Sequence, residues 1–346
     1  MILVVGGYGQ VGARVSKNLV NVIVAGRNQS QADEFIAENN IEGISRRFDT
    51  SNLDDHDFKD VDTIVMCVES NNIDVLKYCI KLKINYIDIS PTTSVLEEIE
   101  SYREEIDRAG IKVIIGVGIA PGVSNLLAKK AVHEMDEVHE IDSYVMLGIG
   151  EEHGRNAVTW LLQNIYSKNP EIQSFTNTKK VPLLRSKRNK KIKTNQIFTR
   201  IDMADSMIMG KLNPSAIART WFAYDVNLVT RAVCFMKRLG FFHSINQPDL
   251  NKRKAAQQKM ARLLNKEMRL AKVLHIGTDA YSIQIHVCGM KNHEKVEKTY
   301  VTYGYCNSNL TAYVAAETTK RIMDFENGLH YLEEVLDISE LDIMVY

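Results

Sequence analysis

The sequence predicts an α/β protein with an N-terminal doubly wound parallel sheet, followed by an α+β domain with a mixed or antiparallel sheet. The first 120 residues alternate short β-branched runs with segments of helical period, which is the pattern of βαβ units. That alternation stops after about residue 125. Near the end, residues 281–287 and much of 297–303 alternate apolar and polar side chains, which indicates antiparallel strands with one buried face.

Size and composition favour a two-domain protein of the reducing cytoplasm. The chain has 346 residues, and single cores stop growing at about 250–300. Its 43 basic and 43 acidic side chains balance, so the composition gives no reason to expect a nucleic-acid partner. The five cysteines form no C-x-x-C pair. The opening apolar run is too short for a signal peptide, and no later run is long enough to span a membrane.

The first domain is expected to contain six strands, at about 2–5, 21–25, 43–48, 63–67, 84–88 and 111–115. Ser30 with Asp33, and Ser94 with Glu97, have the spacing of N-cap and N3 partners. The segment 94–107 has an apolar stripe opposite several glutamates, which predicts one amphipathic helix lying on the sheet.

A glycine loop follows the first strand. It carries the pattern G-x-G-x-x-G at Gly7, Gly9 and Gly12, between an apolar strand and a helical segment. In a Rossmann unit these glycines allow a tight turn, close approach to a pyrophosphate and close helix–strand packing, while the helix N-terminus attracts the phosphate charge. The residues expected to contact a dinucleotide are therefore Gly7, Tyr8, Gly9, Gln10, Val11 and Gly12.

The end of the second strand indicates which dinucleotide binds. An NAD site usually has an acidic residue there, whereas this strand ends in Arg27 and Asn28. A guanidinium forms charge-assisted bonds to a 2′-phosphate worth about 1.5–3 kcal/mol each, so NADP(H) is the expected cofactor. Asp49 is expected near the adenine, and Cys67 and Val68 near the ribose or nicotinamide, because ligands bind at strand ends in such sheets.

The chain resembles the saccharopine dehydrogenase family in its compact bacterial form. The resemblance rests on 5–12, 25–28, 62–68, 86–90 and above all 116–126, and it is strong only over the first 130 residues. It implies an NADP(H)-dependent oxidoreductase of amino-acid metabolism. The implied reaction moves a hydride between nicotinamide and an imine or secondary amine, built from an amino acid and an aldehyde or oxo acid.

The resemblance also implies a discontinuous domain organisation, because the C-terminal helix of this family returns to the nucleotide domain. Residues 1–125 and 305–346 are then the NADP-binding Rossmann domain, and 126–304 the substrate-binding α+β domain. We expect a homodimer that acts on a small, amino-acid-derived substrate.

Candidates for the chemistry lie at strand ends. Asp88 and Ser90 either line the nicotinamide side or only hold their loop. The proton of the amine nitrogen is assigned to Asp88, to His153 or to solvent. Solvent is included because a preformed iminium is already protonated and needs little help from a general acid. Arg155, Arg219 and Arg231 are candidate clamps for substrate carboxylates, although each could also be a surface residue.

The segment after the sixth strand is a candidate substrate site. Pro121 and Gly122 open a helix that carries Ser124 and Asn125, so backbone N–H groups and the Asn125 amide are expected to meet a substrate carboxylate. The alternative is that this segment only starts a helix.

Other patterns bear on metals and partners. His-Glu-x-x-His is absent, and we expect no metal site. Residues 252–272 combine eight basic side chains with an apolar stripe, which predicts a helix that packs on its own domain or weakly contacts an anionic membrane. The basic run 179–193 is expected to be a solvated loop or edge. The alternative to an enzyme is a non-catalytic NADP-binding sensor or membrane-associated protein with the same fold.

Overall fold

A computed structural model describes residues 1–68, 72–151, 178–187, 190–242, 249, 252–253, 255–257, 259–260 and 277–346. The chain divides into two compact units. Unit 1 contains Met1–Leu126 and Ser308–Leu341, and unit 2 contains Leu127–Asn307 and Asp342–Tyr346. The division lies near residues 125 and 305, where the sequence pattern changes, but the last five residues belong to unit 2.

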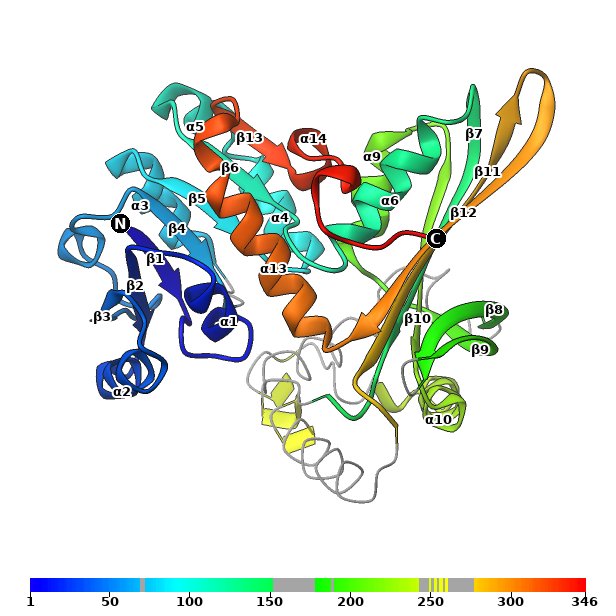
Figure 1. Ribbon diagram of the computed structural model, residues 1–346, viewed down its shortest axis with the longest axis horizontal. Helices are drawn as coiled ribbons and strands as arrows, with labels where there is room; N and C mark the ends of the chain where they lie inside the picture. Colours follow the sequence, from blue (N-terminus) through cyan, green and yellow to red (C-terminus); the bar gives the residue numbers. More distant parts are fainter. Residues whose placement is uncertain are drawn as a thin grey trace. The chain divides into compact units, whose positions relative to one another are not determined.

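A seven-stranded parallel sheet forms the centre of unit 1 (Figure 1), in the order β13-β6-β5-β4-β1-β2-β3. The strands are β1 (Ile2–Val5), β2 (Val22–Gly26), β3 (Gly43–Arg47), β4 (Thr63–Met66), β5 (Asn85–Asp88), β6 (Lys112–Ile115) and β13 (Gly328–Tyr331). The six predicted strands are confirmed, and their order is that of a Rossmann sheet. The order reverses between β1 and β4, so a ligand crevice is expected at their carboxyl ends.

Helices cover this sheet, whose inner strands are mostly apolar. Every residue of β2 and β4 is buried, as expected for parallel strands packed on both faces. The helices of this part of unit 1 are α1 (Gly12–Lys17), α2 (Gln29–Asn39), α3 (Asp74–Leu82), α4 (Thr93–Glu100) and α5 (Arg103–Ala109). The next helix, α6 (Val123–Val132), begins in unit 1 and ends in unit 2.

Two predicted helix starts were wrong. The N-cap of α2 is Asn28, whose extended backbone lets its side chain accept a hydrogen bond from a first-turn N–H, so Ser30 lies inside the helix. The N-cap of α4 is Thr92 rather than Ser94. The segment 94–107 also forms two helices instead of one, because the chain leaves helical geometry between α4 and α5. Its predicted apolar stripe is nevertheless buried at Leu96, Ile99 and Ile106.

The C-terminal segment supplies one strand and two helices to unit 1. The strand β13 pairs in parallel with β6, from Gly328 opposite Lys112 to Tyr331 opposite Ile115. The helix α13 (Asn307–Lys320) buries Leu310 and Val314. A short helix, α14 (Leu332–Val335), follows β13.

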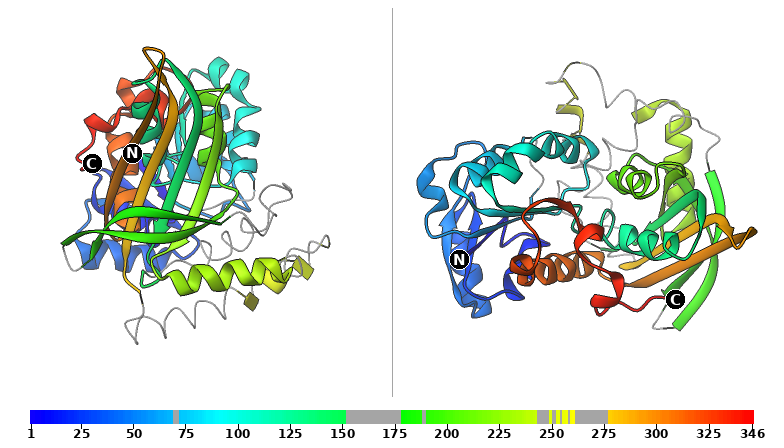
Figure 2. Two further views of the ribbon diagram at one scale, coloured as in Figure 1. Left: turned by 90° about the vertical axis from the view of Figure 1, so that its right-hand side faces the viewer. Right: turned by 90° about the horizontal axis from the view of Figure 1, so that it is seen from above.

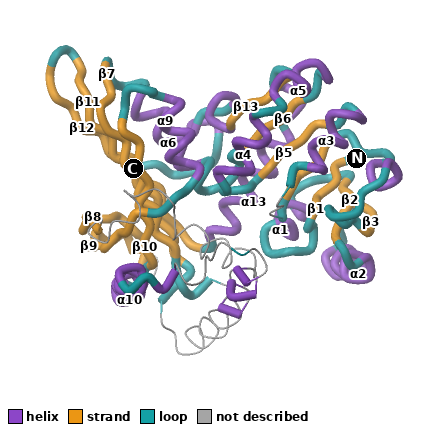
Figure 3. The backbone as a smooth tube through the Cα atoms, turned by 180° about the vertical axis from the view of Figure 1, so that it is seen from behind, coloured by secondary structure: helices purple, strands orange, loops and turns teal. Residues whose placement is uncertain are grey.

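Unit 2 is built on a six-stranded mixed sheet in the order β12-β11-β7-β10-β9-β8 (Figures 2 and 3), which confirms the predicted fold class. The pair β7–β10 is parallel and the other pairs are antiparallel. The elements are β7 (Glu137–Leu147), β8 (Thr178–Lys187), β9 (Lys190–Arg200), α9 (Ala204–Leu212), β10 (Ile217–Tyr224), α10 (Asn227–Arg238), β11 (Ala280–Lys291) and β12 (Glu294–Tyr305). The described residues of the basic run 179–193 lie in the antiparallel strands β8 and β9 at the sheet edge, which is one of the two predicted positions of this run.

The β8–β9 hairpin curls over one face of this sheet. Strand β9 pairs with β10 only at Trp221 and Phe222, and the Ser282 hydroxyl of β11 donates to the Leu184 carbonyl of β8 at 2.7 Å. The curl encloses an apolar core of Tyr144, Met146, Val181, Leu183, Phe198, Trp221 and Ala223. Polar side chains occupy the neighbouring part of the same face.

No helix among the described residues is both long enough and apolar enough to cross a membrane. Most of the predicted basic helix at 252–272 lies outside the described residues.

Candidate functional site

The loop between β1 and α1 depends on four glycines. The N–H groups of Gly6 and Gly7 both donate to the Ala25 carbonyl of β2, at 2.8 and 3.0 Å. Gly6 adopts a left-handed φ of +76°, and a Cβ added at Gly12 would collide with the Gly6 carbonyl. The predicted motif counted Gly7, Gly9 and Gly12, and the structure adds Gly6. Only bare backbone allows this close packing.

Tyr8 joins the loop to the end of β2. A Cβ added at Gly26 would lie 2.5 Å from the Tyr8 ring, so the ring rests on bare backbone. The Tyr8 hydroxyl accepts a hydrogen bond from the Asn28 N–H at 3.1 Å. The structure thus brings together two residues that were predicted separately as cofactor contacts. Gln10 lies at the same turn, where its carbonyl accepts a hydrogen bond from Arg14, and Val11 is the N-cap of α1.

Two exposed arginines lie at neighbouring strand ends. Arg27 follows β2, and Arg47 ends β3 directly opposite Gly26. Hydrogen bonds from Ser51, and then the charges of Arg47 and Arg27, lower the pKa of Asp49. Arg47 was missed by sequence reasoning, although a basic pair at the end of the third predicted strand was a visible signal. Two guanidinium groups at adjacent strand ends suit a phosphate ligand.

Cys67 and Val68 follow β4, as predicted. The Cys67 N–H donates to the Val5 carbonyl at 3.0 Å, and a Val68 methyl group occupies the space beside Gly6 that a larger residue would need. Burial, and then the charge of Asp88, raises the pKa of the Cys67 thiol. Cys67 is therefore a neutral thiol that lines the loop, and it lacks the thiolate character of a nucleophile.

Asp88 is a buried carboxyl group at the end of β5. Its Oδ2 accepts from the Tyr86 hydroxyl and its Oδ1 from the Ser90 N–H, both at 2.6 Å. Burial raises its pKa to about 6, although the two hydrogen bonds oppose this shift. Ser90 is also buried. A carboxyl group that titrates near neutral pH can both give and take a proton, as general acid–base chemistry requires.

In the turn after β6, three successive N–H groups donate to acceptors of the turn itself. The N–H groups of residues 122, 123 and 124 donate to Asn125 Oδ1, the Gly118 carbonyl and the Ile119 carbonyl, at 2.9, 2.9 and 3.1 Å. Pro121 has no N–H group. Ser124 and Asn125 are buried. Pro121, Gly122 and Asn125 therefore brace the turn, and their contact with a substrate stays a prediction.

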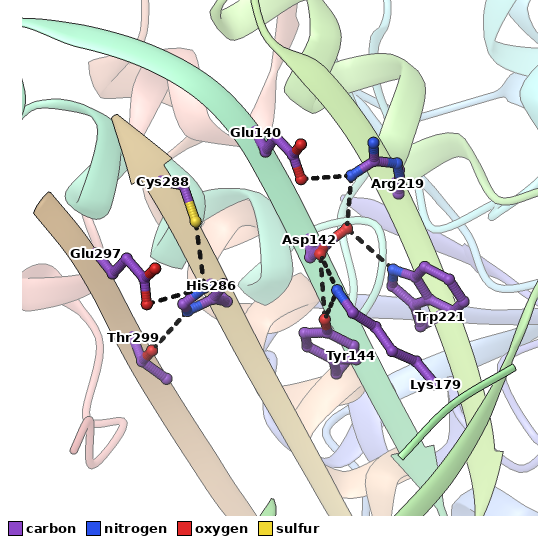
Figure 4. A network of polar contacts seen from close by, with 10 residues as sticks. All are labelled: Glu140, Asp142, Tyr144, Lys179, Arg219, Trp221, His286, Cys288, Glu297 and Thr299. Atoms are coloured by element: carbon purple, nitrogen blue, oxygen red, sulfur yellow. Dashed lines mark hydrogen bonds and ion pairs between the residues drawn. The ribbon is translucent and has the colours of Figure 1, made fainter. Parts of the chain in front are cut away.

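A second polar cluster lies on the sheet of unit 2 (Figure 4). Asp142 is buried and accepts from Lys179 Nζ at 2.8 Å and from Trp221 Nε1 at 3.0 Å. Arg219 donates to Glu140 at 2.7 Å and lies 3.6 Å from Asp142. The predicted carboxylate clamp Arg219 is thus paired with carboxylates of its own chain. His153 and Arg155 lie outside the described residues.

Comparisons with known proteins agree with this geometry. Residues 2–114 match the family model described as the saccharopine dehydrogenase NADP binding domain. Carboxynorspermidine synthase from Vibrio alginolyticus is 25% identical over 183 residues, and the match spans 44% of this chain and 44% of that protein. Apo saccharopine dehydrogenase (L-Glu forming) from Saccharomyces cerevisiae has 18% identity and a TM-score of 0.56, over 96% of this chain and 94% of that chain. This likeness shows a shared fold.

The resemblance and the cofactor predicted from the sequence are therefore confirmed. The first 114 residues carry an NADP-binding domain of the saccharopine dehydrogenase type, and the cofactor is NADP(H). The bare glycine cradle and the two arginines fit a phosphorylated dinucleotide.

Proposed function

We propose that this protein is an NADP(H)-dependent oxidoreductase that acts on a carbon–nitrogen bond. Its substrate would be an imine or secondary amine built from an amino acid and an aldehyde or oxo acid. The observation that carries this proposal is Asp88, a buried carboxyl group with a pKa of about 6, in the same parallel sheet as the glycine cradle. Similarity to proteins named saccharopine dehydrogenase and carboxynorspermidine synthase supports this class of substrate.

The binding of NADP(H) is assigned to groups at the carboxyl ends of β1 to β4. The glycine cradle of residues 6–12 would hold the pyrophosphate, and Arg27 and Arg47 the 2′-phosphate. Asn28, Asp49, Cys67 and Val68 would line the rest of the nucleotide. When bound, this cofactor supplies or accepts the hydride.

Asp88 is the proposed proton-handling group. Reduction of an imine adds a hydride to carbon and leaves the nitrogen with one more proton, and oxidation of the amine reverses both changes. Below about pH 6 the Asp88 carboxyl group carries a proton that it can give. Tyr86 and Ser90 fix the orientation of the carboxyl group. His153 remains a second candidate for this role.

The test is a screen of amino acids paired with aldehydes or oxo acids, followed by the loss of NADPH absorbance. We expect turnover with at least one pair, and a fall of about a hundredfold or more in D88N, because general acid–base groups contribute about 10²–10⁴-fold. The affinity for NADPH should stay unchanged in this variant. Full turnover in D88N would remove Asp88 from the mechanism.

A second outcome favours the alternative function. Tight NADPH binding without oxidation by any pair would support a non-catalytic sensor of NADP(H). The homodimer, the cytoplasmic location and a weak membrane contact through 252–272 stay predictions, which sedimentation and vesicle binding can test.

A further inference from the structure

The β11–β12 hairpin of unit 2 gathers three potential metal ligands on one face. Nε2 of His286 lies 3.3 Å from Sγ of Cys288 and 3.7 Å from a carboxylate oxygen of Glu297 (Figure 4). All three donor atoms lie within 4.8 Å of one another. The register explains this, because Cys288 is directly opposite Glu297, and His286 is two residues from Cys288 on the same face.

A fourth residue orients the imidazole ring. Nδ1 of His286 lies 2.9 Å from the Thr299 hydroxyl, and Thr299 is directly opposite His286 in the sheet. With the proton on Nδ1 and donated to Thr299, the lone pair of Nε2 faces Cys288 and Glu297. Metal-binding histidines are held in the same way, with the second ring nitrogen donating to an oxygen.

We propose that His286, Cys288 and Glu297 bind one divalent ion of the zinc type, with water at the fourth position. Zinc bonds to nitrogen, oxygen and sulfur of about 2.0–2.3 Å place tetrahedral ligands about 3.3–3.6 Å apart. The distances from Nε2 to Sγ and to the Glu297 oxygen, 3.3 and 3.7 Å, are close to this spacing. A set of thiolate, imidazole and carboxylate favours zinc over magnesium or calcium, which prefer oxygen ligands.

The surroundings leave this site electronegative. The nearby cations Lys179 and Arg219 pair with Asp142 and Glu140. The carboxylate of Glu297 pairs with His286 and is 73% exposed, so an ion can reach the site from solvent. A bound cation would be attracted by the carboxylates of Glu297 and Glu140.

The probe is Co²⁺ added to full-length protein that has been stripped with a chelator. We expect a thiolate-to-cobalt charge-transfer band and the intense visible bands of tetrahedral cobalt, both removed by one equivalent of Zn²⁺. C288S should lose the charge-transfer band, while H286Q and E297Q should weaken Co²⁺ binding at least tenfold. T299V should weaken it by about 10–100-fold, because it frees the imidazole ring.

Two variants in the turn of the same hairpin serve as controls. H293Q and E294Q remove potential ligands of the same hairpin that lie outside the cluster, and should bind Co²⁺ as the wild type does. A charge-transfer band that persists in C288S, or equal loss in H293Q, would overturn the proposal. Melting temperatures measured without metal show whether each variant folds. Because the Glu297 side chain is mostly exposed, E297Q should fold normally, so weaker Co²⁺ binding in this variant would report the site itself. None of these measurements depends on NADPH oxidation.

Discussion

Two turns of unit 1 share a sequence pattern and use it differently. Each follows a parallel strand, contains at least one glycine with a left-handed φ, and leads into a helix. In the first, residues 6–12, the N–H groups of Gly6 and Gly7 donate to the neighbouring strand β2, and only that of Gly9 donates inside the turn, to the Gly6 carbonyl. In the second, residues 116–125, three successive N–H groups donate inside the turn. Glycines after a strand therefore indicate that another group packs closely against the backbone. Only the hydrogen-bond partners in the structure show whether that group is a ligand or another part of the same turn.

Removing residues 306–346 tests both turns at once and should have the largest effect. This segment supplies β13 and α13, where Asn309 accepts from Arg14 beside the first turn. A Cβ added at Gly118, in the second turn, would lie 3.5 Å from the Thr311 side chain. We expect unit 1 to unfold and NADPH binding to be lost, as measured by circular dichroism and cofactor fluorescence. A truncated protein with unchanged NADPH affinity and melting temperature would contradict the proposed discontinuous domain.

G122V should destabilise the second turn severely. Gly122 has a φ of +128°, and a Cβ there would lie 2.5 Å from the Gly118 nitrogen and collide with the Gly118 carbonyl. A side chain in such a conformation costs about 1–3 kcal/mol, and overpacking costs about as much again. We expect the free energy of unfolding in urea to fall by about 3 kcal/mol or more. A fully stable variant would show that this turn can open and that its brace is dispensable.

Asp88 lies next to the second turn, where its backbone carbonyl accepts a hydrogen bond from the Val117 N–H. Its side chain should make the stability of unit 1 depend on pH. The folded protein keeps the Asp88 proton up to about pH 6, whereas the unfolded chain releases it near pH 4. Stability from this group is complete below about pH 4 and is lost as the pH rises through 6, by roughly 3 kcal/mol. D88N should remove this slope from the pH dependence of urea unfolding. An identical slope in the variant would show that Asp88 is ionised throughout.

R27A should weaken cofactor binding at the end of β2, next to the first turn, without changing the turn itself. Loss of charge-assisted bonds to the 2′-phosphate should weaken NADPH by about 1.5–3 kcal/mol, or about tenfold to a hundredfold, and leave NADH almost unchanged. Fluorescence titration measures both affinities. R108A, at an exposed helical site, is the matched control. Equal affinities of wild-type protein for NADPH and NADH would leave Arg27 without this role.

G9A should have the smallest effect and makes the contrast with Gly122 direct. A Cβ at Gly9 would lie 3.1 Å from the Gly6 carbonyl, which is tight but tolerable. We expect NADPH binding to weaken by about tenfold, because the methyl group obstructs approach of the pyrophosphate, with a change in melting temperature much smaller than in G122V. If G9A lost stability and kept its affinity, the two turns would not differ in the way that we infer.

The strands, the glycine loop and the cofactor were predictable because their signals are local. The strands of unit 1 are short apolar runs, and the loop motif lies between β1 and α1. Arg27 was recognised because it follows β2 without interruption. The predicted caps Ser30 and Ser94 were wrong, since several neighbouring residues can cap a helix and backbone geometry chooses among them.

The sequence by itself determined the kind of sheet and the cofactor, because residue periodicity and a contiguous motif specify them. Tertiary structure decided which side chains meet. Arg47 lies beside Arg27 through the pairing of β2 with β3, and His286 meets Glu297 through the register of β11 with β12. A shift of one residue in the pairing of β11 with β12 would turn His286 and Glu297 to opposite faces. The sequence lists the chemical groups, and strand register, set by packing across the whole sheet, determines their neighbours.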